Sequence, residues 1–367
     1  MVVRHAAAAQ SPDHDSRLMN FMKLHRATPA RCLAGRSRYH RSVPAPSPSA
    51  LLHPDAPTLR RHALPVGDGH VLNVQEHGRI DGLPALVLHG GPGSGCSPLL
   101  RRFFDPGAFR IVCVDQRGAG SSTPRGGIEH NTTAHLLADL KRVREALGIT
   151  SWLVVGGSWG ATLALAYAAH EPGAITGLLL RASFLARRED IDGFFARASA
   201  DEAPAWDRFA AAVGAGADDA PLPRLAEAFA RADRAACRPL ARAWWAWEQF
   251  LASGTEPPST PDGEALDALV DRYRVQSHYL AHRCWLEAPS LLERCEQAPR
   301  VPTLLLHGRL DRVCPPAGAL ALLQRLPHAA LRWIADAGHD PAHPAMAAAM
   351  VEALDHWATH GHFEAGR

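Results

Sequence analysis

The sequence predicts an α/β protein with a mostly parallel central sheet, flanked by helices and interrupted by an inserted helical segment. One observation is a series of short, largely apolar runs, which is typical of strands buried on both faces. These runs are Ala85–Leu88, Ile111–Val114, Trp152–Val155, Val301–Leu306 and Leu331–Ile334. A second observation is the long stretch 184–296, which separates the first three runs from the last two and which we expect to be helical.

A chain of 367 residues is long enough for one core with an inserted segment. We expect the first part of the core at residues 58–183, a helical cap at 184–296 and the second part of the core at 297–367. The alternation of apolar and polar residues around His70–Glu76 predicts an antiparallel edge strand that opens the sheet.

Residues 1–57 are predicted to form a disordered or non-native extension. From Arg4 to Arg41 the sequence is rich in Arg, His, Ser and Ala, and a run of Pro and Ser follows at Val43–Ser49. Such a composition buries too little apolar surface to offset the entropy of folding. An organellar transit peptide, which is also Arg-rich and poor in acidic residues, is the alternative.

A glycine-flanked serine follows the strand predicted at Trp152–Val155. The run Gly156–Gly160 has the pattern G-x-S-x-G, with Ser158 at its centre, and it precedes a helical stretch of small residues. This setting is typical of a nucleophile elbow, in which glycines are needed because a Cβ would clash with the neighbouring strand or helix. The pattern alone also fits an ordinary turn, so the prediction depends on partners elsewhere in the chain.

A second glycine-rich loop, His89–Gly93, follows the strand predicted at Ala85–Leu88. Its glycines allow backbone N–H groups to approach a ligand closely. We expect Gly91 to supply one donor of an oxyanion hole. The second donor would be the N–H of Trp159, which lies at the positive end of the helix after Ser158.

A serine nucleophile needs a base and a group that orients the base. Asp311 follows the strand predicted at Val301–Leu306, and His339 follows the next one. Both therefore lie at the same edge of the sheet as Ser158, in the order acid and then histidine that this architecture uses. A turn-forming role for Asp311 and a solvated loop position for His339 are the alternatives, with His343 as the reserve base.

Together these segments resemble the prolyl aminopeptidase (proline iminopeptidase) family of the α/β-hydrolase superfamily. The matching runs are HGGPGSGC from His89, RRFFDP from Arg101, VDQRGAGSSTP from Val114, NTT from Asn131, GGSWGATLALAYA from Gly156, LLLRASFLARR from Leu178 and HGRLDRVCP from His307. The resemblance implies an α/β-hydrolase fold with an inserted helical cap. It also implies Ser158, Asp311 and His339 as the catalytic triad, and Gly91 and Trp159 as the oxyanion hole.

Members of this family remove an N-terminal residue, preferably proline, from short peptides, and their cap binds the free amine through carboxylates. The resemblance places Glu248 at the first carboxylate, with the alternative of a surface glutamate. Three tryptophans beside it predict a lined pocket rather than a solvated face. Phe184 and Phe194 match positions that contact the proline ring, and Cys314 matches the pocket edge; core packing and an inert thiol are their alternatives.

One departure from the family concerns its second amine-binding carboxylate, which lies in a motif R-I-E-N-H-Y. The corresponding run here is Arg274–Tyr279, and Gln276 stands where the family has glutamate. A neutral amide accepts a hydrogen bond from an ammonium group, but a charge-assisted bond is stronger. We therefore expect activity with reduced affinity for the free amine. A carboxylesterase or amidase without a free-amine requirement, or a non-catalytic binding protein of this fold, are the alternatives.

Composition excludes several other classes of protein. The net charge is +2 and there is no basic patch interleaved with aromatic residues, so we expect no nucleic-acid partner. No apolar run approaches the roughly 20 residues that cross a bilayer, so we expect no membrane span. The seven cysteines lack metal-ligand spacing, which predicts reduced thiols, a cytoplasmic location and no metal. The predicted chemistry needs no cofactor, its substrate is a short peptide or a small acyl or aminoacyl compound, and the sequence does not set the oligomeric state.

Overall fold

The computed structural model describes residues 51–216 and 219–364. The extension predicted at residues 1–57 therefore lies outside the described residues, except for 51–57. Within that stretch, His53 is 2.8 Å from the carboxylate of Asp355, and Asp55 accepts two hydrogen bonds from Arg101. Residues 53 and 55 thus contact the region that follows.

The core is an eight-stranded sheet with the order β1-β2-β4-β3-β5-β6-β7-β8 within the described part of the chain. Its strands are β1 (Thr58–Gly67), β2 (His70–Gly78), β3 (Leu83–Leu88), β4 (Phe109–Val114), β5 (Trp152–Gly157), β6 (Ile175–Arg181), β7 (Thr303–Gly308) and β8 (Ala330–Ile334). Only β2 runs antiparallel to its neighbours, β1 and β4. The prediction that the strand around His70–Glu76 lies at the edge was wrong, because β1 covers it.

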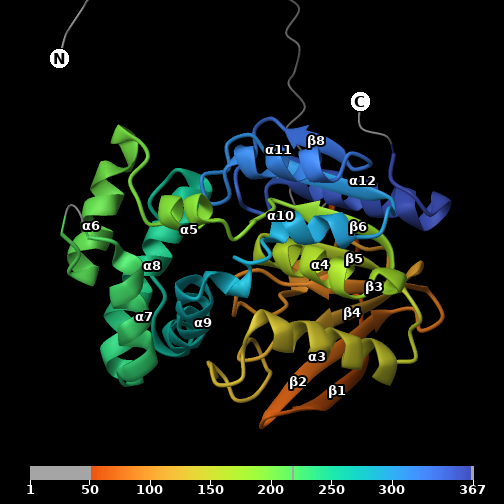
Figure 1. Cartoon of the computed structure of the whole chain (residues 1–367), viewed down its shortest axis with the longest axis horizontal. Helices are drawn as coiled ribbons and strands as arrows, with labels where there is room; N and C mark the ends of the chain where they lie inside the picture. The colour runs from red at the N-terminus through yellow and green to blue at the C-terminus, as the bar shows by residue number, and fades with distance from the viewer. Residues whose placement is uncertain (1–50, 217–218, 365–367) are drawn as a thin grey trace, which may run out of the picture. The chain divides into compact units, whose positions relative to one another are not determined.

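Helices cover both faces of the sheet (Figure 1). The core helices are α2 (Pro98–Arg101), α3 (Thr133–Ala146), α4 (Trp159–His170), α10 (Leu291–Arg294), α11 (Pro316–Arg325) and α12 (Pro344–His360), with short 3₁₀ turns at Pro172–Ala174 and Cys295–Gln297. Alternate residues of each strand face opposite sides. On β5, Val154 belongs to the apolar cluster that includes residues of α3, α4 and α11, whereas Leu153 and Val155 belong to the cluster that includes residues of α12. This alternation explains why the strands are apolar throughout.

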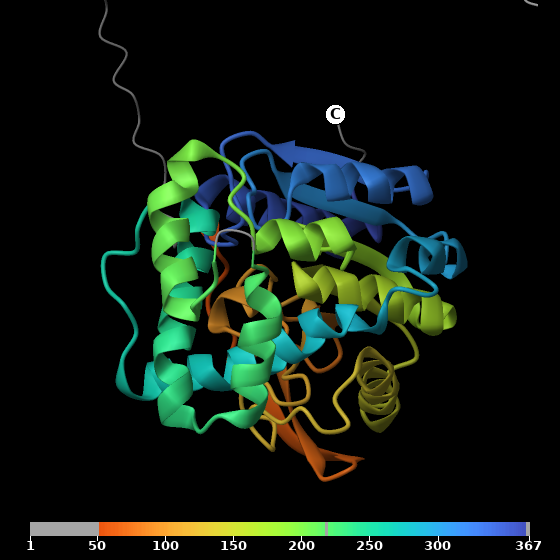
Figure 2. The same cartoon turned by 60° about the vertical axis from the view of Figure 1, so that its left-hand side comes forward.

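In the described residues, five helices lie between β6 and α10, on the path that leads from β6 to β7. They are α5 (Arg188–Phe194), α6 (Ala203–Val213), α7 (Pro221–Arg231), α8 (Arg234–Ser253) and α9 (Gly263–Ala281), with 3₁₀ turns at Ala200–Glu202 and Arg283–Trp285. Figure 2 brings these helices forward, with the sheet behind them. The predicted cap boundaries fall between β6 and α5 and within the turn Cys295–Gln297. They remain predictions, because helix positions alone do not define a folding unit.

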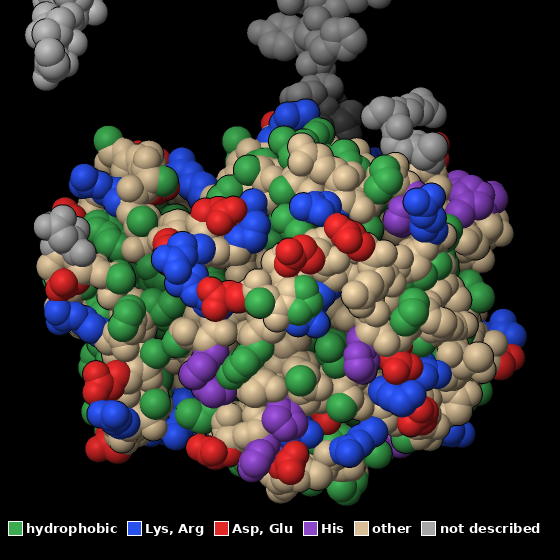
Figure 3. Space-filling model, in the orientation of Figure 1, with side chains coloured by type: hydrophobic (Ala, Val, Ile, Leu, Met, Phe, Trp, Pro, Cys, Tyr) green, Lys and Arg blue, Asp and Glu red, His purple; other side chains and the backbone are tan. Residues whose placement is uncertain are grey.

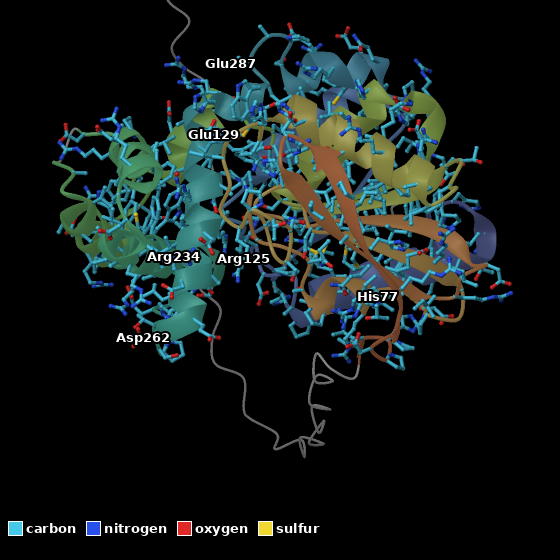
Figure 4. The ribbon with its side chains drawn as sticks, turned by 90° about the horizontal axis from the view of Figure 1, so that it is seen from below. His77, Arg125, Glu129, Arg234, Asp262 and Glu287 are labelled. Atoms are coloured by element: carbon cyan, nitrogen blue, oxygen red, sulfur yellow. The ribbon has the colours of Figure 1, made fainter. Side chains whose placement is uncertain are left out.

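Helix α9 joins the cap helices to the core. Its Asp271 binds Arg234 of α8 at 2.6 Å and lies 3.7 Å from Arg125 of the loop after β4. Figure 4 shows Arg234 and Arg125 beside α9. Farther along α9, the Tyr279 hydroxyl donates to the side chain of Asn131 at 2.8 Å. Contacts at two points along the helix therefore fix its position against the core.

The surface carries charges of both signs. Figure 3 shows Lys and Arg side chains interspersed with Asp and Glu on the face it presents. Among the helices of the described residues, none combines the length and the apolar character that crossing a bilayer requires. The described cysteines are all free, and they are Cys96, Cys113, Cys237, Cys284, Cys295 and Cys314.

Candidate active site

Ser158 lies on a strained turn between β5 and α4. Its backbone angles are φ 57° and ψ −124°, a combination that residues other than glycine rarely adopt. A Cβ on Gly156 would lie 2.2 Å from the carbonyl oxygen of Gly160, and a Cβ on Gly160 would lie 2.2 Å from that of Leu88. Both positions therefore require glycine, as the nucleophile-elbow pattern predicts.

The loop predicted to form the oxyanion hole lies against Ser158. A Cβ on Gly90 would lie 3.6 Å from the Cβ of Ser158. Gln116 connects the two segments, because its side-chain amide donates to the carbonyl of His89 at 3.1 Å and accepts from the Trp159 indole at 2.8 Å. Gly91, at φ 111°, completes the loop. The two predicted donors, Gly91 and Trp159, thus belong to segments that are held together next to the serine.

Asp311 and His339 form a hydrogen-bonded pair. Nδ1 of His339 is 2.9 Å from one carboxylate oxygen of Asp311. The other oxygen accepts the N–H groups of Val313 at 3.0 Å and Cys314 at 2.8 Å. Asp311 is 3% exposed. Its burial favours the neutral acid, but His339, His307 and the N–H of Cys314 together outweigh burial and hold the pKa of Asp311 below its ordinary value.

Ser158 and His339 line one cavity of about 470 Å³. The other predicted residues that line it are Gly91, Phe184, Phe194, Glu248, Gln276 and Cys314. The Ser158 hydroxyl lies 3.9 Å from the thiol of Cys314. The reserve base, His343, is not among the lining residues; it precedes the first residue of α12. Side chains distant in the sequence therefore meet in one cavity at the sheet edge.

Glu248 has two partners that no sequence pattern predicted. Nη2 of Arg272 lies 2.7 and 2.8 Å from its carboxylate oxygens, and the Tyr273 hydroxyl donates to one of them at 2.9 Å. Burial disfavours the charge on Arg272, but Glu248 and Tyr273 together outweigh burial and hold the pKa of Arg272 above its ordinary value. Gln276 is 4% exposed, and its Oε1 has no hydrogen-bond partner among the described residues.

Arg181, the last residue of β6, also lines the cavity, although no sequence pattern predicted it. Its guanidinium donates to the carbonyl of His339 at 2.6 Å, and a Cβ on Gly157 would lie 2.7 Å from it. Its position at the same sheet edge as Ser158 was the available signal. For Arg272, the signal was its spacing of one helical turn from Gln276 on α9.

The pocket predicted beside Glu248 is present, but the neighbouring tryptophans do not line it. Trp244 and Trp247 are buried in the interior of the cap. Trp244 stacks on Tyr273 with ring centroids 4.5 Å apart, and the Trp247 indole donates to the carbonyl of Phe194 at 2.9 Å. These tryptophans build the core of the cap, because a small helical layer needs large apolar side chains to fill it.

One group in the described residues has donor atoms close enough to hold a metal ion. The ligand atoms of Asp68, His130 and His135 lie within 4.8 Å of one another. This group does not line the cavity, and Asp68 is already 3.3 Å from Arg117.

Comparison with known proteins bears on the family and the fold. The model of the α/β-hydrolase fold family matches residues 84–343. The chain is 38% identical over 322 residues to a proline iminopeptidase of Xylella fastidiosa, covering 83% of this chain and 98% of that protein. It is 39% identical over 300 residues to a proline iminopeptidase of Arabidopsis thaliana, covering 79% and 77%.

Two solved structures share the fold. A proline iminopeptidase-related protein from Thermus thermophilus superposes with a TM-score of 0.53 at 26% identity, over 81% of this chain and 97% of that one. A proline iminopeptidase from Mycobacterium smegmatis superposes with a TM-score of 0.57 at 20% identity, over 82% and 100%. The second likeness is evidence for the fold alone.

Proposed function

The chain belongs to the proline iminopeptidase family of α/β hydrolases, and we propose that it releases the N-terminal residue, proline or another small one, from short peptides. The predictions of the family and of the α/β-hydrolase fold are confirmed by these relatives. The single observation that carries the proposed mechanism is the hydrogen bond that Asp311 accepts from His339, which lines the same cavity as Ser158.

In the proposed reaction, Oγ of Ser158 attacks the carbonyl carbon of the first residue while Nε2 of His339 takes the hydroxyl proton. The N–H groups of Gly91 and Trp159 stabilise the oxyanion. His339 then returns the proton to the leaving amine, which departs and leaves an acyl-enzyme. A water molecule, activated in the same way by His339, hydrolyses the ester and regenerates Ser158. Asp311 fixes the imidazole and stabilises its cation.

The cavity supports the proposed substrate class. Its volume of about 470 Å³ suits one residue and part of the next. Phe184 and Phe194 line it and offer apolar contacts to a pyrrolidine ring or another small side chain. We propose that the enzyme acts in the cytoplasm, in keeping with the free thiols of its described cysteines.

The mechanism is tested with a prolyl arylamide substrate and three alanine variants. Ser158→Ala should lower kcat by at least about 10⁴-fold, because the nucleophile is removed. His339→Ala should have a comparable effect, whereas His343→Ala, outside the cavity, should remain close to wild type. Activity surviving in Ser158→Ala, or lost in His343→Ala with the fold intact, would overturn the assignment.

A further inference from the structure

The carboxylate that the family resemblance assigns to amine binding is already neutralised in this chain. Both oxygens of Glu248 accept from Nη2 of Arg272, and one also accepts from Tyr273. Glu248 is 12% exposed and Arg272 is 22% exposed, so water screens this pair only in part. We call Glu248, Arg272 and Gln276 the amine subsite. Its net charge is zero, because the charges of Glu248 and Arg272 cancel and the amide of Gln276 is neutral.

Arg272 is held in place by its surroundings. A Cβ on Gly93 would lie 2.8 Å from the carbonyl oxygen of Arg272, so α9 packs directly on the oxyanion loop. The residues on either side are also fixed, Asp271 by Arg234 at 2.6 Å and Tyr273 by stacking on Trp244. Figure 4 shows Arg234 beside α9. Moving Arg272 away from Glu248 would therefore separate a half-buried ion pair without any compensating shift of the helix.

The other charged groups of the cavity do not restore a negative potential at the amine subsite. Its titratable and charged lining residues are His89, Arg181, Asp190, Glu248, Arg272, Cys314, His339 and Asp340. Both carboxylate oxygens of Asp190 accept from Arg187, at 2.6 and 3.0 Å. Asp340 is exposed to solvent on the core side. An ammonium group entering the amine subsite would lose water and would meet the guanidinium of Arg272.

We propose that Arg272 is a specificity-determining residue, and that the amine subsite selects an acyl group whose nitrogen carries no charge. The inference rests on the proposed acyl transfer at Ser158. The buried Oε1 of Gln276 accepts one N–H, which a deprotonated N-terminal amine, or an N-acylated residue other than proline, supplies without a positive charge. The enzyme then takes N-terminal proline as the neutral amine, and it also accepts acyl groups without a basic nitrogen.

Two substrates with acyl groups of the same shape separate the effect of the charge on the nitrogen from the effect of shape. Prolyl arylamide carries a basic ring nitrogen, and cyclopentanecarbonyl arylamide replaces that nitrogen with carbon. The ratio of their kcat/KM values measures what the nitrogen contributes, and it cancels any titration of the enzyme that affects both substrates alike. A terminal amine titrates near pH 8, so its neutral fraction increases about tenfold between pH 7 and pH 9.

For the wild-type enzyme, the ratio of prolyl to cyclopentanecarbonyl kcat/KM should increase with pH, by up to about tenfold between pH 7 and 9. In Arg272→Met combined with Gln276→Glu, which makes the amine subsite anionic, the ratio at pH 7 should exceed the wild-type ratio by at least tenfold and should fall as pH increases. Arg274→Met is the matched control, because Arg274 lies on the same helix but does not line the cavity. Its ratio should equal that of wild type.

A wild-type ratio that is high at pH 7 and falls above pH 8 would overturn the inference and leave the proposed function intact. An equal ratio in the double variant would also overturn it. If the double variant fails to fold, the wild-type pH profile and the single variant Gln276→Glu decide the question. If the wild-type enzyme hydrolysed neither of the two substrates, the proposed function would be overturned together with the inference.

Discussion

The core side and the cap side of the cavity differ in what fixes their geometry. On the core side, backbone approaches set the position of Ser158, since Gly156 and Gly160 leave no space for a Cβ. On the cap side, side chains of two helices set the amine subsite, through the Glu248–Arg272 pair. A single substitution there changes charge without disturbing the backbone. The chemistry is therefore constrained more tightly than the specificity.

The largest effect should come from the triad acid on the core side. In Asp311→Asn, the amide would donate to Nδ1 of His339 and leave the proton on Nε2, where it blocks general-base action. We expect kcat for prolyl arylamide to fall by about 10³–10⁴-fold, measured under saturating substrate. Asp336→Asn is the control, because Asp336 is exposed on the loop that leads to His339. Equal activity in both variants would contradict the assignment of Asp311.

The second-largest effect should come from the backbone of the nucleophile elbow at Ser158. Gly160→Ala places a methyl group where the carbonyl oxygen of Leu88 lies 2.2 Å away, and backbone atoms cannot yield as a flexible side chain does. We expect the free energy of unfolding in urea to decrease by about 1–3 kcal/mol. Gly173→Ala is the control, because a Cβ there meets no atom within 4 Å. Similar losses in both variants would show that close approach at the elbow is not the cause.

The same difference explains what could be predicted from the sequence. The elbow at Ser158 and the loop at Gly91 depend on glycines that are neighbours in the chain, so their patterns are visible locally. The Arg272–Glu248 pair joins two helices, and no local pattern specifies how those helices pack. The tryptophans beside Glu248 were assigned to the pocket for the same reason, although Trp244 and Trp247 fill the cap interior.

At the edge of the sheet, the local sequence pattern did not identify the outermost strand. The strand β1 contains Arg60, Arg61 and Pro65, and its residues alternate poorly between buried and exposed positions at the start of the strand. Its sequence therefore gives a weak strand signal, and the more regular β2 was taken for the edge. The antiparallel direction of β2 was predicted correctly, because alternation reflects one covered face along the strand.

The smallest effect should come from the second partner of Glu248, and it tests whether Arg272 alone sets the charge of the amine subsite. Tyr273→Phe removes the hydroxyl that donates to Glu248 at 2.9 Å but keeps the ring that stacks on Trp244. We expect a loss of about 1 kcal/mol in the free energy of unfolding, from the urea midpoint at an unchanged m-value.

Because Arg272 still binds both oxygens of Glu248 in Tyr273→Phe, the ratio of prolyl to cyclopentanecarbonyl kcat/KM should stay near that of wild type. Arg272→Met, by contrast, leaves the carboxylate with the Tyr273 hydroxyl alone and should increase the ratio. If Tyr273→Phe increased the ratio as much as Arg272→Met, hydrogen bonding to Glu248 rather than the guanidinium charge would govern selection. The two variants thus separate the geometry of the cap side from its electrostatics.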